Sequence, residues 1–159
     1  MNIFNLFKKK PINQRIKEKS EKIQELTLDD LRGLAQDNKW LLDIQREARK
    51  YSQEIRDSHG VDTDTIPTGY GKYGLTPTNP IPTYSASGSD LYLSQLRTID
   101  GKKIDAIRKG STGAFDVTPG SIDIYELSMK GKVLCSIYIC PYHKKNSELA
   151  PAGYKLTSK

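Results

Sequence analysis

The densest run of apolar residues in the chain lies between Ser121 and Tyr142, and its pattern predicts two β-strands joined by a tight turn. β-Branched and aromatic residues dominate both halves of this run, and such side chains suit a pleated, half-buried surface. Between the halves, Gly131 can adopt the positive φ that a tight hairpin turn requires. Pro141 has no backbone N–H and is therefore expected to end the second strand.

Side chains along the second strand alternate between two faces, because the period of a β-strand is two residues. One face is entirely apolar, and we predict that it faces the core; its residues are Val133, Cys135, Ile137 and Ile139. The opposite face is mixed, and we expect it to be covered by a helix or to be partly in water; its residues are Leu134, Ser136, Tyr138 and Cys140.

Helical periodicity is strongest over residues 38–58, where apolar side chains recur every three or four positions and Gly60 offers a stop signal. We expect this helix to pack on a face of the sheet. A narrower apolar stripe over residues 12–26 predicts a marginal helix that needs a partner surface, either on the domain or on another chain. Further along, Ser89 is predicted to cap a short helix over residues 89–97, with a strand as the alternative.

Two shorter segments, 104–109 and 150–156, have strand-like patterns, the second one irregular. Together these elements predict an α+β fold with a helical N-terminal arm, a small antiparallel sheet and a short helix. The sheet is expected to be a meander of about three strands, at residues 104–109, 122–127 and 132–140. The chain is expected to divide into a helical N-terminal region (1–59), a Pro/Gly/Thr-rich connector (60–88) and a small α+β domain (89–159).

Within the connector, glycines flank two tyrosines, Tyr70 and Tyr73. Such a segment is either an adaptable contact loop or an ordered coil whose tyrosines lie flat on the domain. The second interpretation is favoured, because tyrosine is often buried with only its hydroxyl in water. A structureless segment as long as residues 60–88 is uncommon unless it is functional or a linker.

The charge of the chain indicates what kind of partner it could bind. The 159 residues carry a net charge of +6, and residues 101–159 hold ten basic but only five acidic side chains. This excess would favour an anionic partner, although many soluble surfaces have a similar balance. No apolar run approaches the roughly 18 residues of a transmembrane helix. The lysines of residues 8–10 follow a very short apolar segment, the reverse of a secretory signal, so we expect a cytoplasmic location.

Candidate chemistry is sparse. Cys140 and His143 have the two-residue spacer of half a zinc site, but the second ligand pair is missing, so we expect no metal and no cofactor. Cys135 and Cys140 point to opposite faces of one strand and are expected to be free thiols. Residues 69–74 resemble a dinucleotide-binding fingerprint only superficially, because they do not lie between a strand and a helix. With no nucleophile elbow either, an enzyme of unidentified type is the least favoured function.

The second half of the chain carries an ordered set of short motifs: YGLTPTNPIP, YLSQLRT, DGKKI, RKGS, GSIDIYEL, IYICPYHKKNS and APAGYKL. With this set the chain resembles a family of small uncharacterised bacterial proteins, from about Gly74 to Leu156 and not over residues 1–60. The resemblance implies a bacterial origin and a domain boundary. It brings no activity, cofactor or site residue with it.

These features favour a non-enzymatic protein-interaction module, of the adaptor or partner-neutralising type. Its partner would be another protein, or a second copy of the chain bound through the N-terminal helices. The alternative is a nucleic-acid-binding protein that uses a basic, tyrosine-bearing C-terminal surface. Residues 142–145 are expected to be exposed at the end of the sheet. The candidate partner-binding residues are Tyr70, Tyr73, Arg108, Lys109, Tyr142, His143, Lys144 and Lys145.

Overall fold

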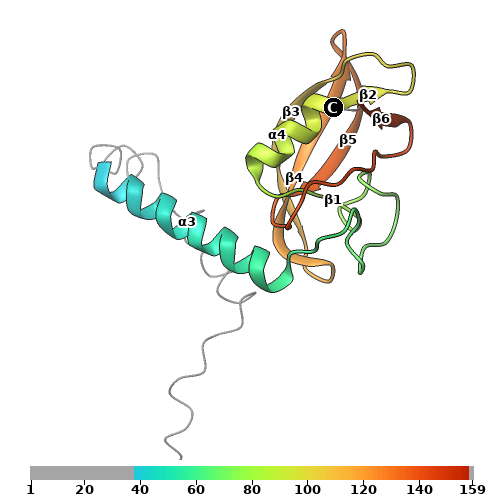
Figure 1. Ribbon diagram of the computed structural model, residues 1–159. Coiled ribbons are helices and arrows are strands. Elements are labelled where there is room, and N and C mark those ends of the chain that lie inside the picture. Colours follow the sequence, from blue (N-terminus) through green and yellow to red (C-terminus); the bar gives the residue numbers. More distant parts are fainter. Residues whose placement is uncertain (1–37, 158–159) are drawn as a thin grey trace, which may run out of the picture. The chain divides into compact units, whose positions relative to one another are not determined.

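The computed structural model describes residues 38–157, with side chains from residue 42 onward. Its elements, in chain order, are α3 (Asn38–His59), β1 (Ile81–Pro82), α4 (Ala86–Gln95), β2 (Leu96–Thr98), β3 (Asp105–Ala114), β4 (Thr118–Met129), β5 (Lys132–Cys140) and β6 (Tyr154–Leu156). The chain forms two units, residues 1–49 and residues 50–159, and the second unit holds all the described strands. The two described helices and the mostly antiparallel sheet confirm the predicted α+β class (Figure 1).

The main sheet has the strand order β1-β5-β4-β3. Strands β3, β4 and β5 form the predicted antiparallel meander, with Tyr125 of β4 opposite both Arg108 and Ile137. β1 runs parallel to β5 and places Ile81 beside Ile139, a pairing that the sequence did not predict. Prolines on both sides of Ile81 argue against an interior strand, but the missing N–H of Pro82 is tolerated at the edge of a sheet.

The turn between β4 and β5 is formed by Lys130 and Gly131, which both have positive φ, 51° and 77°. Two successive residues with positive φ indicate a type I′ turn, whose twist matches that of the flanking strands. Nothing lies within 4 Å of a Cβ built on Gly131, so glycine is needed here for its backbone and not for space. The predicted turn is confirmed, and Lys130 is an additional left-handed residue.

The predicted core face of β5 is confirmed at one end of the strand and wrong at the other. Ile137 and Ile139 are fully buried, whereas Val133 is 55% exposed. Burial decreases along β5 toward the turn, because the end of the hairpin extends past α4 (Figure 1). The register of β4 and β5 also shifts between Leu127 and Ser128, which places Val133 opposite Ser128.

Both faces of the main sheet carry a hydrophobic core. The larger cluster lies on the face covered by α4 and consists of Ile81, Tyr92, Leu96, Ile104, Tyr125, Leu127, Ile137 and Ile139. The smaller cluster lies on the opposite face and consists of Ile66, Ala114, Ile122 and Cys140. Residues 60–85 therefore contribute buried side chains, Ile66 and Ile81, to both faces of the sheet.

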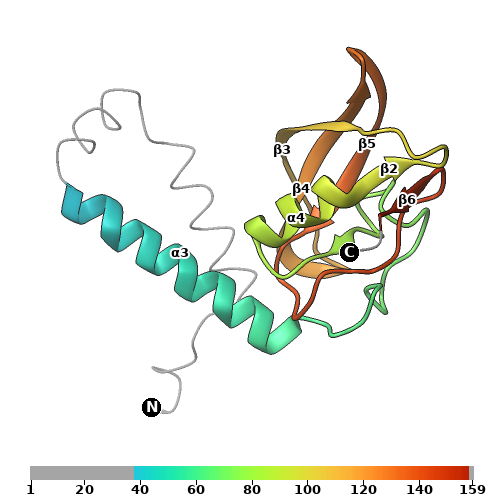
Figure 2. The same ribbon diagram turned by 45° about the horizontal axis from the view of Figure 1, so that its top comes forward.

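Helix α4 confirms the predicted short helix, but its cap was assigned to the wrong serine. Ser85 is the N-cap, and its Oγ accepts a hydrogen bond from the Gly88 N–H at 3.2 Å. Ser89 is buried instead, and its hydroxyl lies 2.8 Å from that of Thr83. Figure 2 shows α4 lying across the strands of the main sheet, with β2 continuing directly from its C-terminal end. β2 pairs with β6 in a second, antiparallel sheet, which confirms the irregular strand predicted near the C-terminus.

Helix α3 confirms the helix predicted over residues 38–58. Residues 42–50 are exposed, whereas Ile55 near the C-terminal end is buried, so burial is seen only in the last turns. Gly60 ends the helix, where its N–H donates to the Arg56 carbonyl at 3.0 Å. Neither described helix is long and apolar enough to cross a membrane. The marginal helix predicted for residues 12–26 lies outside the described residues, as does part of the N-terminal helices through which a second copy was expected to bind.

Candidate binding cleft

Three of the four basic residues that the sequence singles out are paired with carboxylates. The pairs are Arg108–Asp123 at 2.7 Å, Lys109–Glu126 at 3.6 Å and Lys145–Asp64 at 3.1 Å. In the first pair, Nε and Nη2 of Arg108 both donate to Oδ1 of the nearly buried Asp123, and this raises the pKa of Arg108. Lys144 is exposed. The predicted cations therefore do not form one free cationic surface.

The prediction that residues 142–145 are exposed is wrong for His143, which is only 2% exposed. Its backbone N–H donates to the Thr83 carbonyl at 3.0 Å, and its Nδ1 accepts from the Val61 N–H at 3.1 Å. Because Nδ1 is an acceptor, the neutral ring carries its proton on Nε2, and this buried atom has no partner among the described residues. Burial lowers the pKa of His143 to about 4. The ring is therefore a neutral contact that anchors residues 142–147, which we call the strap.

Of the three candidate tyrosines, only Tyr70 has a largely exposed ring, at 57%. Its hydroxyl donates to Oδ2 of Asp116 at 2.9 Å. The Tyr73 hydroxyl donates to Oγ of Ser147 at 2.6 Å, and burial raises the pKa of Tyr73 to about 12. Tyr142 is half-buried. The interpretation of residues 69–74 as an ordered coil with its tyrosines on the domain thus holds for Tyr73 and not for the Tyr70 ring.

A cleft of about 470 Å³ lies between α4, the strap and β6. Its lining residues come from segments far apart in the sequence: Leu91, Gln95, Asn146, Ser147, Glu148, Leu156 and Thr157. In Figure 1 the coil that follows β5 runs beside α4 before it reaches β6. A volume of this size is within the range of small-ligand and peptide-side-chain sites.

Hydrogen bonds fix both ends of the cleft. At one end the Asn146 side chain accepts from the Tyr84 N–H at 2.8 Å and donates to the Gly88 carbonyl at 2.9 Å. A Cβ at Gly88 would lie 2.5 Å from Oδ1 of Asn146, so glycine allows this close approach. At the other end the Thr157 N–H donates to the Gln95 carbonyl at 3.0 Å. The cleft is thus held open by contacts between its own walls.

The cleft also presents groups that are free to bind. Leu91 on α4 lines the cleft and is 49% exposed. The backbone N–H of Glu148 donates to Oδ1 of Asp64, which fixes the position of this residue. Within the described part of the chain, the carboxylate of Glu148 and the side-chain amide of Gln95 make no hydrogen bond. The walls therefore combine aliphatic surface with one available carboxylate and one available amide.

The outer edge of β6 adds backbone groups to the same cleft. The Thr157 N–H donates to the carbonyl of Gln95, the residue just before β2, so it points toward β2. Successive backbone groups of a strand alternate in direction. The N–H and C=O of Leu156 therefore point away from β2. Leu96 lies opposite Leu156, but its N–H donates to the Leu93 carbonyl and ends α4. β6 is the last of the described strands in its sheet. Among the residues that the structure describes, Leu156 therefore offers an unpaired donor and an unpaired acceptor at the rim.

The cleft is lined by aliphatic, amide and hydroxyl side chains and one carboxylate. The hydroxyl of Ser147 donates to the Asp64 carbonyl at 2.9 Å, so no base activates it as a nucleophile. Cys135 and Cys140 are free thiols, and burial raises the pKa of Cys140 to about 12, which keeps its thiol protonated. Over residues 38–157 there is no group of three or more His, Cys, Asp or Glu side chains arranged to hold a metal ion.

Sequence reasoning missed the cleft, although one signal for it was present. Leu91, Tyr92 and Leu93 are consecutive apolar residues in a short helix, and three consecutive positions cannot all face one core. Tyr92 is buried and Leu91 is the exposed one. The other wall depends on long-range contacts, such as the hydrogen bond from the Ser147 N–H to the Pro82 carbonyl, and local pattern does not show them.

Comparisons with protein-family models, with curated proteins and with solved structures found no match. The family resemblance of residues 74–156 stays a prediction.

Proposed function

We propose that the chain is a non-enzymatic protein-interaction module that binds an extended peptide segment of a partner protein in the cleft between α4, the strap and β6. The observation that carries this proposal is the unpaired edge of β6 at Leu156, which lies beside exposed aliphatic surface. An extended peptide can add to such an edge, so that its backbone supplies affinity and its alternate side chains supply specificity.

Two properties of the bound peptide follow from the walls. An aliphatic side chain would lie between Leu91 and Leu156, where it would remove apolar surface from water. A lysine or arginine next to it would pair with the carboxylate of Glu148, which has no hydrogen bond of its own among the described residues. With only a short edge available, we expect dissociation constants on the order of 1–100 µM.

Selection from a phage-displayed library of linear peptides, about twelve residues long, tests the proposal with the full chain as bait. We expect enriched peptides to place an aliphatic residue beside a basic one. Leu91→Asp and Glu148→Lys should each weaken binding of the selected peptides by about tenfold or more, because they remove the apolar wall and the carboxylate. Both side chains are exposed in the free protein, so both variants should fold.

Ile107→Asp is the matched control. Ile107 is an exposed aliphatic residue on β3, with 57% exposure, and it lines no part of the cleft. This control should bind the selected peptides as the wild type does. Peptides that bind the Leu91→Asp variant with unchanged affinity, or a library that yields no enriched sequence, would contradict the proposal.

A further inference from the structure

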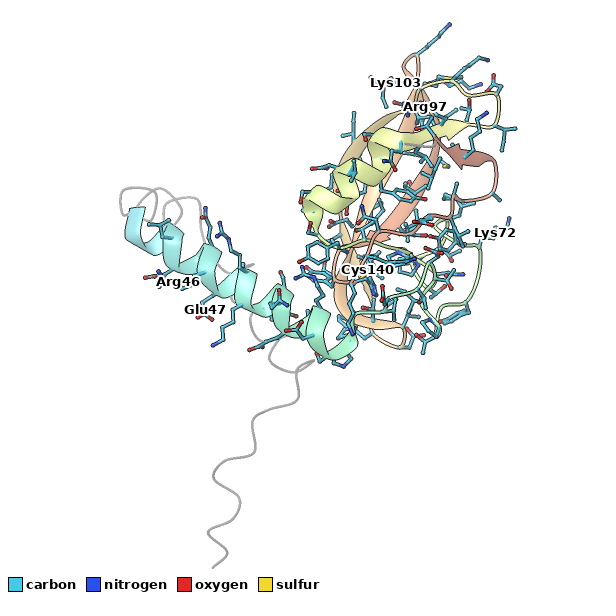
Figure 3. All side chains as sticks on the ribbon, viewed as in Figure 1. Arg46, Glu47, Lys72, Arg97, Lys103 and Cys140 are labelled. Atoms are coloured by element: carbon cyan, nitrogen blue, oxygen red, sulfur yellow. The ribbon has the colours of Figure 1, made fainter. Side chains whose placement is uncertain are left out.

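A row of three cations crosses the outer face of the small sheet. Arg97 of β2 lies directly opposite Lys155 of β6 on one side. On its other side Arg97 forms an antiparallel bridge with Lys103. Adjacent chain segments in a sheet lie about 4.8 Å apart, so the three residues span roughly 10 Å. We call Lys103, Arg97 and Lys155 the cationic row, and Figure 3 shows Arg97 and Lys103 close together at one end of the domain.

The alternation of side chains keeps the cationic row on the face away from the core. Leu96 is fully buried, so its neighbour Arg97 points to the opposite face. Lys155 lies between the half-buried residues Tyr154 and Leu156, and it is exposed, as is Lys103. Nη1 of Arg97 donates to the carbonyls of Ser94 and Leu96 at 2.7 and 2.8 Å, which holds the guanidinium in place. Its other N–H groups have no acceptor among the described residues.

No carboxylate neutralises the row within the described part of the chain, where none of its three cations makes an ion pair. The nearby Asp100 does not pair with the row. Its carboxylate forms an ion pair with Lys102 at 2.5 Å and accepts a hydrogen bond from the Thr98 hydroxyl. Like charges directly opposite each other destabilise a sheet. A bound polyanion would remove this repulsion.

We propose that the cationic row binds the phosphodiester backbone of a single-stranded nucleic acid, without reading its base sequence. A flexible polyphosphate chain can place successive phosphates on cations that are fixed at regular spacing. The row offers no stacking platform, because the hydroxyl of Tyr154 lies 3.0 Å from Sγ of Cys135 and its ring is half-buried. The contacts would therefore be purely electrostatic.

Other anionic partners fit this surface less well. Polybasic recognition of an anionic membrane uses clusters of about four to eight cations, more than the row contains. An acidic protein would need an apolar anchor at the centre of the contact, and the centre of the row is Arg97. None of the three residues of the row lines the cleft, so this proposal does not rest on peptide binding there.

Fluorescence anisotropy with labelled oligothymidylate of about 20 nucleotides tests the proposal on the full chain. Three phosphate contacts predict that the logarithm of the binding constant falls with the logarithm of salt concentration with a slope of about −2. Lys103→Gln and Lys155→Gln should each weaken binding by about fivefold and reduce the slope by about 0.7. Arg97→Gln should act in the same way, and Arg97→Lys should restore most of the slope, because it restores the charge.

Lys144→Gln is the matched control, since Lys144 is an exposed lysine outside the row. It should leave both affinity and slope unchanged. Equal losses in the control and the row variants would overturn the proposal, and so would row variants that bind as the wild type does. Binding to polyglutamate or to phosphatidylserine vesicles, with no binding to the oligonucleotide, would also overturn it and assign the row to an acidic protein or a membrane.

Discussion

Nδ1 of His143 accepts a hydrogen bond from the backbone N–H of Val61, a residue 82 positions earlier in the chain. This bond ties the strap to the segment that follows α3. A protonated imidazole has no acceptor nitrogen, so it cannot keep this bond. The folded chain therefore selects the neutral form of His143.

The first prediction concerns stability at acidic pH. The folded-state pKa of His143 is about 4, below the ordinary value of 6.5. The unfolded chain therefore takes up this proton first as the pH falls, so the contribution of the neutral ring is complete above about pH 6.5 and is lost progressively toward pH 4. The predicted loss is roughly 3 kcal/mol in the free energy of unfolding, measured by urea denaturation over this pH range.

His143→Asn should remove this pH dependence, because the amide oxygen can accept from Val61 and does not titrate. His59→Asn is the control, since His59 is exposed and should retain the wild-type profile. Equal pH dependence in wild type and the His143 variant would contradict the assignment of this histidine.

The second prediction separates two ion pairs on neighbouring residues. Arg108→Ala should lower the free energy of unfolding by about 1–3 kcal/mol, because it leaves the nearly buried carboxylate of Asp123 without its donor. Lys109→Ala should cost less than about 0.5 kcal/mol, since its pair with Glu126 is long and exposed. Chemical denaturation measures both. If adding Asp123→Asn to the Arg108 variant recovers none of the lost stability, the buried carboxylate is not the cause.

The third prediction concerns the turn between β4 and β5. Lys130 has a φ of 51°, a conformation that asparagine adopts more readily than lysine. Lys130→Asn should therefore raise the free energy of unfolding by a few tenths to about 1 kcal/mol, and Gly131→Ala should lower it by about 1 kcal/mol or more. Thermal unfolding of the two variants checks the signs. A destabilised asparagine variant would show that the turn is not type I′.

The fourth prediction tests which face of β5 supports the fold. Ile137→Asp should prevent folding, because it places a charge in the fully buried cluster under α4. Leu134→Asp should be tolerated, because Leu134 is exposed on the other face. Circular dichroism of the purified variants shows the difference, and a folded Ile137 variant beside an unfolded Leu134 variant would reverse the assignment.

Local pattern was enough to predict the hairpin, the main helix and the antiparallel meander. Alternation placed Ile137 and Ile139 in the core, and Gly131 marked the turn. Alternation wrongly placed Val133 in the core, because burial near the turn depends on how far other elements extend along the hairpin. The parallel strand β1 was missed for a similar reason. Its two residues form a strand because they pair with β5, and not because of their own strand propensity.

Less of the candidate site than of the fold could be predicted from the sequence. The net positive charge of the C-terminal region led to the prediction that Arg108, Lys109 and Lys145 bind a partner. Each of them is paired with a carboxylate, and composition alone does not show such pairing. The unneutralised cations Arg97 and Lys155 come together only through the pairing of β2 with β6. Exposure of His143 was predicted from its place after the last long strand, and the fold of the strap over Thr83 reverses it.

Hydrogen exchange at the Leu156 amide, followed by NMR, is the most direct test of the proposed peptide-binding cleft. This N–H points away from β2 and has no partner in its sheet, so it should exchange rapidly in the free protein. Addition of a peptide selected from the library should protect it, while the Lys155 amide, which faces β2, should be protected with or without peptide. A Leu156 amide that is already protected in the free protein, or that still exchanges rapidly with the peptide bound, would contradict the proposed strand addition.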